Sequence, residues 1–466
     1  MSMEFHSARR SFSRTYVRGE VLTQAANAMS KGLGVANSLI VLSALSVFHF
    51  GLYQLILSAA AIAESMSAGL FDDVVITDTA RGLAEDRRPE SKRLFNQFAV
   101  FKIGVGAAMA VALFAGAEVV AAFYDRDIAG LVRIASALVL VSTLRATEEI
   151  FFIASVSFSW LWTQTVLEVS KLALLVSFLA VGGFGVRQVL VAAVGASLVA
   201  LLFSSIFFIP EYRRAFAGVS SAPANLLLAA GKRYGMWVSL RYGFGKVIKN
   251  IRPWLIKFLL NTEAVALYAL GVNIISLAQG LMPIGMLGRL LPWELKDAAR
   301  FRFIFLRSVK YALWIGLAMA ILGAVILPPL IILILPKYAP AMPVLLALLL
   351  TLPPYGVYKI HKSVLGVLRE QKVLSLRVMT EAGLVVGLNA VLLPLIGIVG
   401  VGVECALTYA WRILFFHREL VRRRPELAIK LKYLFSVDAA DREFFGRVMS
   451  ELTRVSGRVG QAFGRS

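Results

Sequence analysis

The chain has 466 residues, of which 58% are apolar and 17% are charged, and its formal net charge is +21. A soluble protein of this composition could not cover its core with polar surface, so soluble enzymes, secreted scaffolds and disordered chains are excluded. The single cysteine excludes an internal disulfide, and no two of the four histidines have metal-ligand spacing, so no metal site is expected.

The apolar runs predict an all-α polytopic membrane protein with about twelve transmembrane helices, since a span needs about 20 mostly apolar residues. The spans are expected near residues 19–43, 50–74, 95–123, 129–155, 160–181, 187–209, 234–258, 262–287, 308–334, 341–361, 374–395 and 399–420. The basic N-terminus has no apolar region followed by a cleavage site, so no cleavable signal peptide is expected.

These spans divide the chain into five predicted parts. They are a cytoplasmic N-terminal segment (1–18), an N-terminal six-helix half (19–209), a cytoplasmic linker (210–233), a C-terminal six-helix half (234–420) and a basic cytoplasmic tail (421–466). The segments assigned to the cytoplasm hold 36 Lys and Arg, and the outer loops hold 4. This asymmetry follows the positive-inside rule and places both termini in the cytoplasm. It also accounts for most of the net charge without nucleic acid as a partner.

The first two spans carry the polar residues of the N-terminal half that matter here. Gln24, Asn27 and Lys31 recur at spacings of three and four, which places them on one helix face. Glu64 in the second span is the acid expected to lie deep in the membrane near them. Glu404, in the last span, is expected to be shallow.

The seventh span carries four cations, Arg241, Lys246, Lys249 and Arg252. At about 100° per residue they lie on one face roughly 140° wide. Each cation would cost about 2.5–3.5 kcal/mol facing lipid, so we expect them to face a water-filled central cavity that binds an anion. The alternative is that this segment is a basic amphipathic helix on the inner leaflet rather than a span.

Two further patterns concern the organisation of the whole chain. Several residues recur at an offset of 215, which predicts two parallel six-helix halves related by a pseudo-two-fold axis. The matches are Leu52-Tyr53-x-Leu55 with Leu267-Tyr268-x-Leu270, Gly182-x-x-Gly185-Val186 with Gly397-x-x-Gly400-Val401, Lys31 with Lys246, and Glu64 with Gln279. The tail has apolar residues at helical spacing from Phe445 to Val455, interleaved with arginines. This pattern is typical of an amphipathic helix on the inner leaflet, and a partner-binding segment is the alternative.

The run from Leu45 to Leu55 resembles the leucine-glycine, aromatic-glycine, tyrosine signature of the polysaccharide-biosynthesis flippases of the multidrug/oligosaccharidyl-lipid/polysaccharide (MOP) superfamily. The glycine-rich run Gly397–Gly402 resembles their entry to the twelfth helix. Ser43 stands where that family usually has arginine, and Ser46 where glycine is common. The resemblance covers about residues 15–420.

The resemblance implies a transporter, not an enzyme, that flips a polyprenyl-pyrophosphate-linked oligosaccharide from the inner to the outer leaflet of a bacterial inner membrane. Lys31, Arg241, Lys246, Lys249 and Arg252 would bind the substrate, Gln24 and Asn27 would extend the polar face, and Glu64 would be a counterion or coupling residue. No cofactor is expected, and a proton or sodium gradient would drive transport. The protein would be surrounded by membrane lipid. A polysaccharide polymerase or a glycosyltransferase would be its protein partner.

Three rival functions are weighed against this one. A MOP-superfamily exporter of drugs or another amphiphile would favour acids in the cavity. A membrane-bound sugar ligase or polymerase would need a large external loop, which is absent from this sequence. A scaffold without transport would leave the intramembrane cations unexplained.

Overall fold

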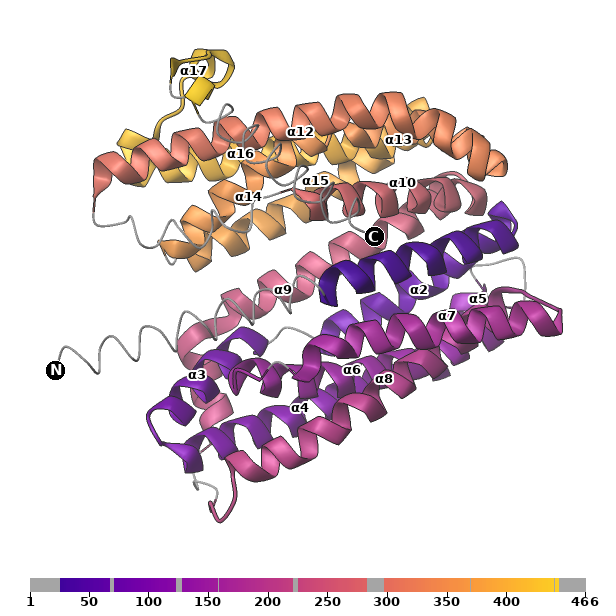
Figure 1. The fold of residues 1–466 in the computed structure, drawn as a ribbon, viewed down its shortest axis with the longest axis vertical. Helices are drawn as coiled ribbons and strands as arrows, with labels where there is room; N and C mark the ends of the chain where they lie inside the picture. The colour runs from indigo at the N-terminus through magenta and orange to yellow at the C-terminus, as the bar shows by residue number, and fades with distance from the viewer. Residues whose placement is uncertain are drawn as a thin grey trace, which may run out of the picture.

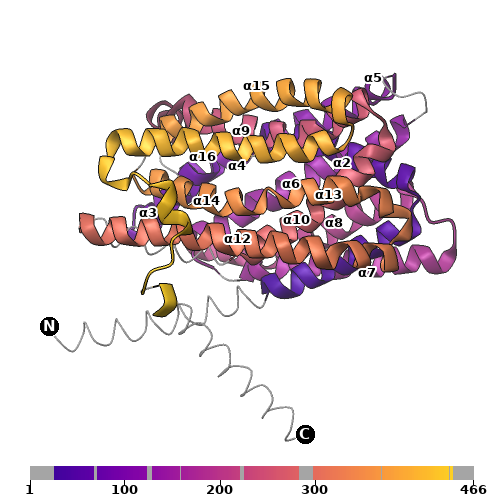
Figure 2. The ribbon, with the colours of Figure 1, turned by 90° about the horizontal axis from the view of Figure 1, so that it is seen from above.

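The computed structural model describes residues 26–67, 71–122, 128–157, 159–220, 225–282, 297–368, 370–439 and 441–443. Within these ranges all regular secondary structure is helical, and most helices run along one common direction (Figure 2). Gln24, residues 1–18 and the tail beyond residue 443 lie outside the described residues, as does the side chain of Arg241.

The N-terminal half forms one bundle, coloured indigo to magenta in Figure 1. A helix is described over residues 26–44 and ends just before α2. The elements that follow are α2 (Val47–Ser67), α3 (Asp72–Ala84), α4 (Arg88–Ala115), α5 (Ala117–Ala122), α6 (Ala129–Ala154), η1 (Ser159–Trp162), α7 (Thr163–Val181) and α8 (Val186–Ala215). Gly182 ends α7 with a φ of 86°, a conformation that favours glycine.

The C-terminal half forms the second bundle, and α9 runs between the two (Figure 1). Its elements are α9 (Leu226–Leu259), α10 (Thr262–Leu281), α12 (Ala298–Ile334), η3 (Pro336–Ala341), α13 (Met342–Leu349), α14 (Leu352–Val367), α15 (Gln371–Ile396), α16 (Val399–Arg423), η4 (Pro425–Leu427) and α17 (Leu431–Phe435). Side chains cap the N-termini of α10 and α12. Asn261 accepts a hydrogen bond from the Ala264 N–H at 2.7 Å, and Asp297 accepts from the N–H groups of Ala299 and Arg300.

Nine of the described helices are long and apolar enough to cross a membrane, and the bent pair Pro336–Leu349 and Leu352–Val367 would make ten. Helix α9 has 34 residues, but its cations keep it outside that group. The prediction of an all-helical polytopic membrane protein is therefore confirmed, whereas the count of twelve spans is not. Each predicted span from the second onward nevertheless overlaps an observed helix.

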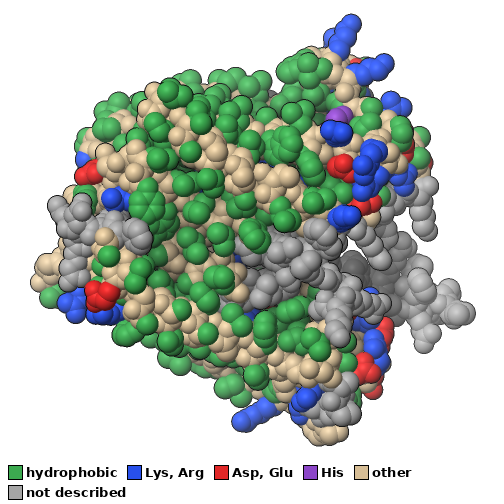
Figure 3. Space-filling model, turned by 180° about the vertical axis from the view of Figure 1, so that it is seen from behind, with side chains coloured by type: hydrophobic (Ala, Val, Ile, Leu, Met, Phe, Trp, Pro, Cys, Tyr) green, Lys and Arg blue, Asp and Glu red, His purple; other side chains and the backbone are tan. Residues whose placement is uncertain are grey.

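Large apolar side chains cover the outside of the bundles, as Figure 3 shows for one face. Val100, Val181 and Leu333 are 75%, 86% and 82% exposed, although each lies in a helix that is long enough to span. In water such a surface would drive aggregation, so it indicates contact with lipid.

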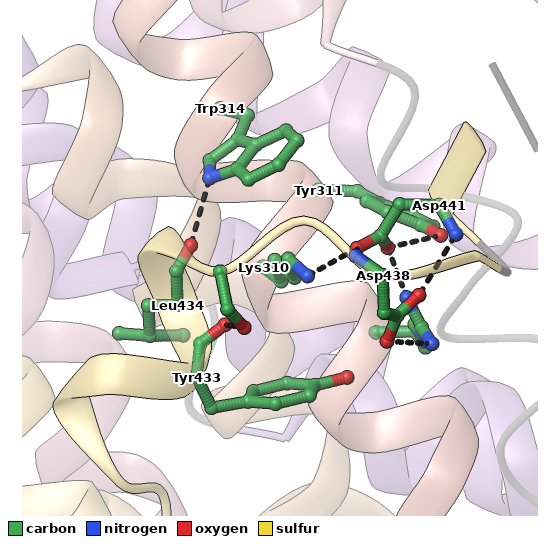
Figure 4. Close-up of polar contacts among 9 residues, drawn as sticks. Lys310, Tyr311, Trp314, Tyr433, Leu434, Asp438 and Asp441 are labelled. Atoms are coloured by element: carbon green, nitrogen blue, oxygen red, sulfur yellow. Dashed lines mark hydrogen bonds and ion pairs between the residues drawn. The ribbon is translucent and has the colours of Figure 1, made fainter.

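A short segment after α16 folds back onto α12 through a cluster of polar contacts (Figure 4). Asp441 contacts both Arg307 and Lys310 of α12, and the side chains of Lys310 and Asp441 are fully buried. Trp314 donates its indole N–H to the Leu434 carbonyl at 2.8 Å. We call the segment from Leu431 to Asp441 the C-terminal strap.

Candidate functional site

A cavity of about 340 Å³ lies inside the C-terminal half, bounded by α9, α10, α14, α15 and α16. Its wall carries four cations and one carboxylate, together with tyrosines, small hydroxyl residues and one amide. These polar lining residues are Lys249, Arg252, Arg377, Arg412, Glu381, Tyr268, Tyr358, Tyr409, Ser276, Thr351, Thr408 and Gln279. This composition suits an anion with neighbouring hydroxyl groups.

Helix α9 packs against α2 of one half and α15 of the other. Because α15 is also a wall of the cavity, this packing brings cations of α9 to the cavity. Asn225 caps its start by accepting from the Leu228 N–H at 3.3 Å. Lys249 and Arg252, three residues apart, both reach the cavity wall. Lys249 is exposed, and among the described residues no carboxylate lies within ion-pair distance of it.

Arg252 differs from the expectation of a free cavity cation. Its guanidinium donates two hydrogen bonds to the carboxylate of Glu404, at 2.9 and 3.0 Å. Glu404 is 0% exposed, and Thr408 donates a further hydrogen bond to it at 2.6 Å. The pair is neutral as a unit, which is the usual way to hold an arginine in the interior of a membrane protein.

A second ion cluster in the cavity wall has an excess of positive charge. The Glu381 carboxylate contacts Arg377 through one oxygen and Arg412 through the other. The guanidinium of Arg412 also lies 4.4 Å from the Tyr409 ring centroid. The Nε atoms of both arginines are buried without a partner in the described part of the chain. With Glu404 included, the wall has four cations against two carboxylates, an excess of two.

The sequence interpretation missed Arg377, Glu381 and Arg412. The two arginines were assigned to cytoplasmic segments because each adjoins a basic stretch. Both also fall within predicted spans, 374–395 and 399–420, and in the structure they lie in α15 and α16 and contact Glu381. The i, i+4 spacing of Arg377 and Glu381 was the available signal, since it places opposite charges on one helix face.

The other predicted residues lie around the cavity rather than inside it. Lys31 donates to the Gly280 carbonyl at 3.5 Å, next to the cavity residue Gln279, and so reaches from the first helix to α10. Asn27, one turn earlier, is exposed.

Lys246 and Glu64 belong to a separate group at the seam of α2, α3, α4 and α9. Lys102 of α4 is 1% exposed and contacts Asp72 at 2.8 Å. It also lies close enough to Lys246 and Glu64 to interact with both electrostatically. The predicted cationic face of α9 thus serves two places, the cavity and the seam. Within the described ranges, no group of three or more acidic, histidine or cysteine side chains could hold a metal ion.

Comparison with known proteins identifies a family. Residues 42–291, more than half of the chain, match the model of a family described as polysaccharide biosynthesis protein. No curated protein sequence matches significantly.

Solved structures identify the fold. The lipid II flippase MurJ in an inward closed conformation superposes with a TM-score of 0.65 over 89% of each chain, at 13% identity. An inward-facing multidrug resistance MATE transporter of the MOP superfamily superposes with a TM-score of 0.60 over 87% of this chain and 96% of that one, at 13% identity. A MOP-superfamily transporter from Pyrococcus furiosus gives a TM-score of 0.54 over 86% and 93%, also at 13% identity. At this identity the likeness establishes the fold, which is that of the MOP superfamily.

Proposed function

The chain belongs to the polysaccharide biosynthesis protein family and has the MOP fold, and from that premise we propose that it is a transporter that flips a polyprenyl-pyrophosphate-linked oligosaccharide across the membrane. The direction is from the inner to the outer leaflet of a bacterial inner membrane, with both termini in the cytoplasm. The two halves, residues 19–209 and 234–420, would rock against each other to expose the site alternately.

The observation that carries this proposal is the excess of positive charge in the wall of the cavity. A pyrophosphate linkage bears about two negative charges that cannot cross hydrocarbon unaided. Lys249, Arg377 and Arg412 offer point-charge and planar donors, which are suited to phosphate oxygens. An exporter of cationic drugs would gain nothing from such a wall.

Glu381 has a specific role in this proposal. It occupies the donors of Arg377 and Arg412 while the cavity is empty, so that neither arginine is left without a counterion. The pyrophosphate would take the place of the Glu381 carboxylate on the donors of Arg377 and Arg412, and it carries a higher negative charge. Arg252 stays paired with Glu404 and shapes the wall instead of binding substrate directly.

The remaining predicted residues extend the site beyond this cavity. Lys31, Arg241 and Lys246 would contact the pyrophosphate or acidic sugars as the substrate enters and leaves, and Gln24 and Asn27 would hydrogen-bond sugar hydroxyls. Glu64 would respond to protonation or to a bound cation, beside Lys102 and Lys246. A proton or sodium gradient would supply the energy.

The test is a deletion strain in which lipid-linked oligosaccharides are quantified on each leaflet by mass spectrometry. Complementation would compare wild type, the pair Lys249→Gln with Arg412→Gln, and Lys257→Gln. The last variant removes one cation from the helix that carries Lys249, at a position outside the cavity lining. We expect unflipped intermediate to accumulate in the deletion and in the double variant, and wild-type levels with Lys257→Gln.

Normal flipping in the deletion strain would refute the proposal. Export of another amphiphile, the alternative for this fold, would then be tested by comparing the exported small molecules of the two strains.

A further inference from the structure

A second cavity, entirely different in character, lies where α2, α4 and α9 meet. It is a groove of about 370 Å³ walled by apolar side chains from all three helices. The lining residues are Ala59, Ile62, Ala63, Met66, Met109, Ala112, Leu113, Ile251 and Trp254. Met66 and Ala112 are exposed, so the groove opens on the outside of the protein, toward the bilayer. Such a wall suits a hydrocarbon chain.

Helix α9 forms part of both cavities, with different faces. At about 100° per residue, and with Lys246 at zero, Ile251 and Trp254 lie near 140° and 80°, on the groove side. Lys249 and Arg252 lie near −60° and −120°, on the side of the charged cavity. One helix therefore separates a hydrocarbon site from a polyanion site.

Lys246 lies between these two faces. Its side chain is exposed, and it lies about 7.5 Å along the helix axis from Ile251, toward the start of α9. It also interacts electrostatically with Lys102, which belongs to α4, a wall of the groove. A cation is thus placed at one end of the hydrocarbon groove and beside the charged cavity.

We infer that the groove between α2, α4 and α9 binds the first isoprene units of the polyprenyl chain, with Lys246 at the pyrophosphate that joins chain and sugar. This inference rests on the proposed function. The substrate then matches three faces of α9 in order: hydrocarbon at Ile251 and Trp254, the junction of chain and pyrophosphate at Lys246, and the pyrophosphate itself extending toward Lys249 in the charged cavity.

The position of the groove favours the substrate's own chain over a membrane acyl chain. The groove is formed by α2 and α4 of the N-terminal half and by α9, which packs on α15 of the other half. Rocking of the halves would change its width, so a chain held there would move with the transport cycle. A bulk acyl chain has no such link to the charged cavity.

The experiment uses the purified full-length protein in nanodiscs of phosphatidylethanolamine and phosphatidylglycerol. The probe is a long-chain polyprenyl pyrophosphate with a photoreactive group in its second isoprene unit. We expect adducts in residues 109–113 and 251–254. Ala112→Trp, which fills the groove, should lower the yield about tenfold. Ala318→Trp, the same change at an exposed alanine of α12 away from the groove, should not.

Each outcome bears on the inference. Adducts spread over the lipid-facing helices, or equal yields from the two tryptophan variants, would overturn it. Labelling that is displaced equally well by added phosphatidylglycerol and by unlabelled polyprenyl pyrophosphate would assign the groove to bulk lipid and overturn it too. Binding of inorganic pyrophosphate, measured in parallel, should be unchanged by Ala112→Trp. If wild type binds neither pyrophosphate nor the probe, the proposed function itself fails.

Discussion

Lys249 and Arg252 lie three residues apart on α9, yet their surroundings give them different roles. Arg252 is buried against Glu404 and forms two charge-assisted hydrogen bonds, whereas Lys249 is exposed in the cavity. Breaking a buried ion pair by removing one partner leaves an uncompensated charge, while removing an exposed cation leaves nothing unpaired. Stability and transport should therefore respond separately at these two positions.

The first prediction is that Glu404→Gln destabilises the protein by about 3–5 kcal/mol, because Arg252 loses its counterion in the interior. Lys249→Gln should change the stability by no more than about 0.5 kcal/mol while abolishing transport. Thermal unfolding of the purified variants measures the change in stability. Glu118→Gln is the control, because it breaks the exposed pair with Arg133 and should have little effect. Equal losses for Glu404→Gln and Glu118→Gln would contradict the structural role of the pair.

The second prediction concerns Glu381, which neutralises two arginines at once. Glu381→Gln should lower the unfolding temperature, and inorganic pyrophosphate should restore it by more than it raises that of wild type. The reason is that the vacated donors of Arg377 and Arg412 become available to the added anion, and a ligand that binds only the folded state stabilises it. The same titration of Glu118→Gln, at an exposed ion pair outside the cavity, should give no extra recovery. A pyrophosphate response equal to that of wild type would show that Glu381 does not compete for this site.

At the scale of elements, α2 and α10 form a close contact between the two halves in the described part of the chain. Gly51 of α2 lies so close to the start of α10 that a Cβ there would be 2.1 Å from the Thr262 carbonyl oxygen. The sequence offset of 215, which predicts a duplication, pairs Tyr53 of α2 with Tyr268 of α10 and Leu55 with Leu270. All four side chains are buried. Their shared environment supports a duplication, which stays a proposal.

The third prediction follows from that contact. Gly51→Ala should destabilise the protein by about 1–3 kcal/mol, since the backbone of α10 must move to make room. Gly104→Ala in α4 meets nothing within 4 Å and removes a helix-weakening glycine. It should leave stability unchanged or raise it by up to about 1 kcal/mol. Thermal unfolding of the two variants in the same detergent checks both signs. Similar stability changes for Gly51→Ala and Gly104→Ala would mean that α2 and α10 can move apart at little cost in free energy.

The C-terminal strap gives a prediction about pH. Burial alone would raise the pKa of Asp441, but hydrogen bonds from the Asp438 backbone N–H and from Lys310 lower that pKa well below its ordinary value. A hydrogen bond from Arg307 likewise lowers the pKa of Asp438. Because both pKa values are lower in the folded state, docking keeps its full stability above the ordinary aspartate value of about 3.9. It weakens progressively as the pH falls below that value, and it is lost once the pH has fallen through the folded values.

We therefore expect the strap to resist pepsin down to a pH of about 4 and to become cleavable below it. Asp441→Asn should be cleaved even above a pH of about 4, because residue 441 then offers no negative charge to Arg307 and Lys310. Asp86→Asn, at the exposed pair with Arg88, is the matched control and should behave as wild type. Mass spectrometry of the fragments identifies the cleavage sites. Cleavage of the wild-type strap by pepsin above a pH of about 4 would contradict this account.

Much of the helical architecture could be predicted from the sequence, and the reasons for the failures are physical. Apolar runs mark where helices lie, so α6, α7 and α16 were placed within a few residues of their observed bounds. Partners far apart in the sequence leave no such pattern: nothing near Arg252 in the chain indicates Glu404, 152 residues away. Likewise, a cation at the end of a span looks the same in the sequence as one in the adjoining basic loop, which is why Arg377 and Arg412 were not recognised as cavity residues.

At the scale of the whole molecule, the two halves are tied together at the end where η3 meets the first helix. Lys337 of η3 donates to the carbonyl oxygens of Ser43 and Leu45, at 2.7 and 2.6 Å. Phe50 and Tyr338 meet edge to face beside them, with ring centroids 6.0 Å apart. On the proposed orientation this end faces the outside, since Lys337 belongs to a predicted outer loop. Transport by rocking requires these contacts to break in every cycle.

The last prediction tests that requirement directly. Ser43 and Lys337 are both exposed, so cysteines at these positions can be joined by a bismaleimide reagent that contains a cleavable disulfide, in a Cys405→Ala background. The joined protein should still bind inorganic pyrophosphate, because the cavity lies elsewhere between α9 and α16. It should lose transport in proteoliposomes and regain it when the reagent is cleaved. Each single-cysteine variant should transport normally after the same treatment. Undiminished transport by the joined protein would mean that this end stays closed throughout the cycle, and that the substrate crosses by a movement other than rocking of the halves.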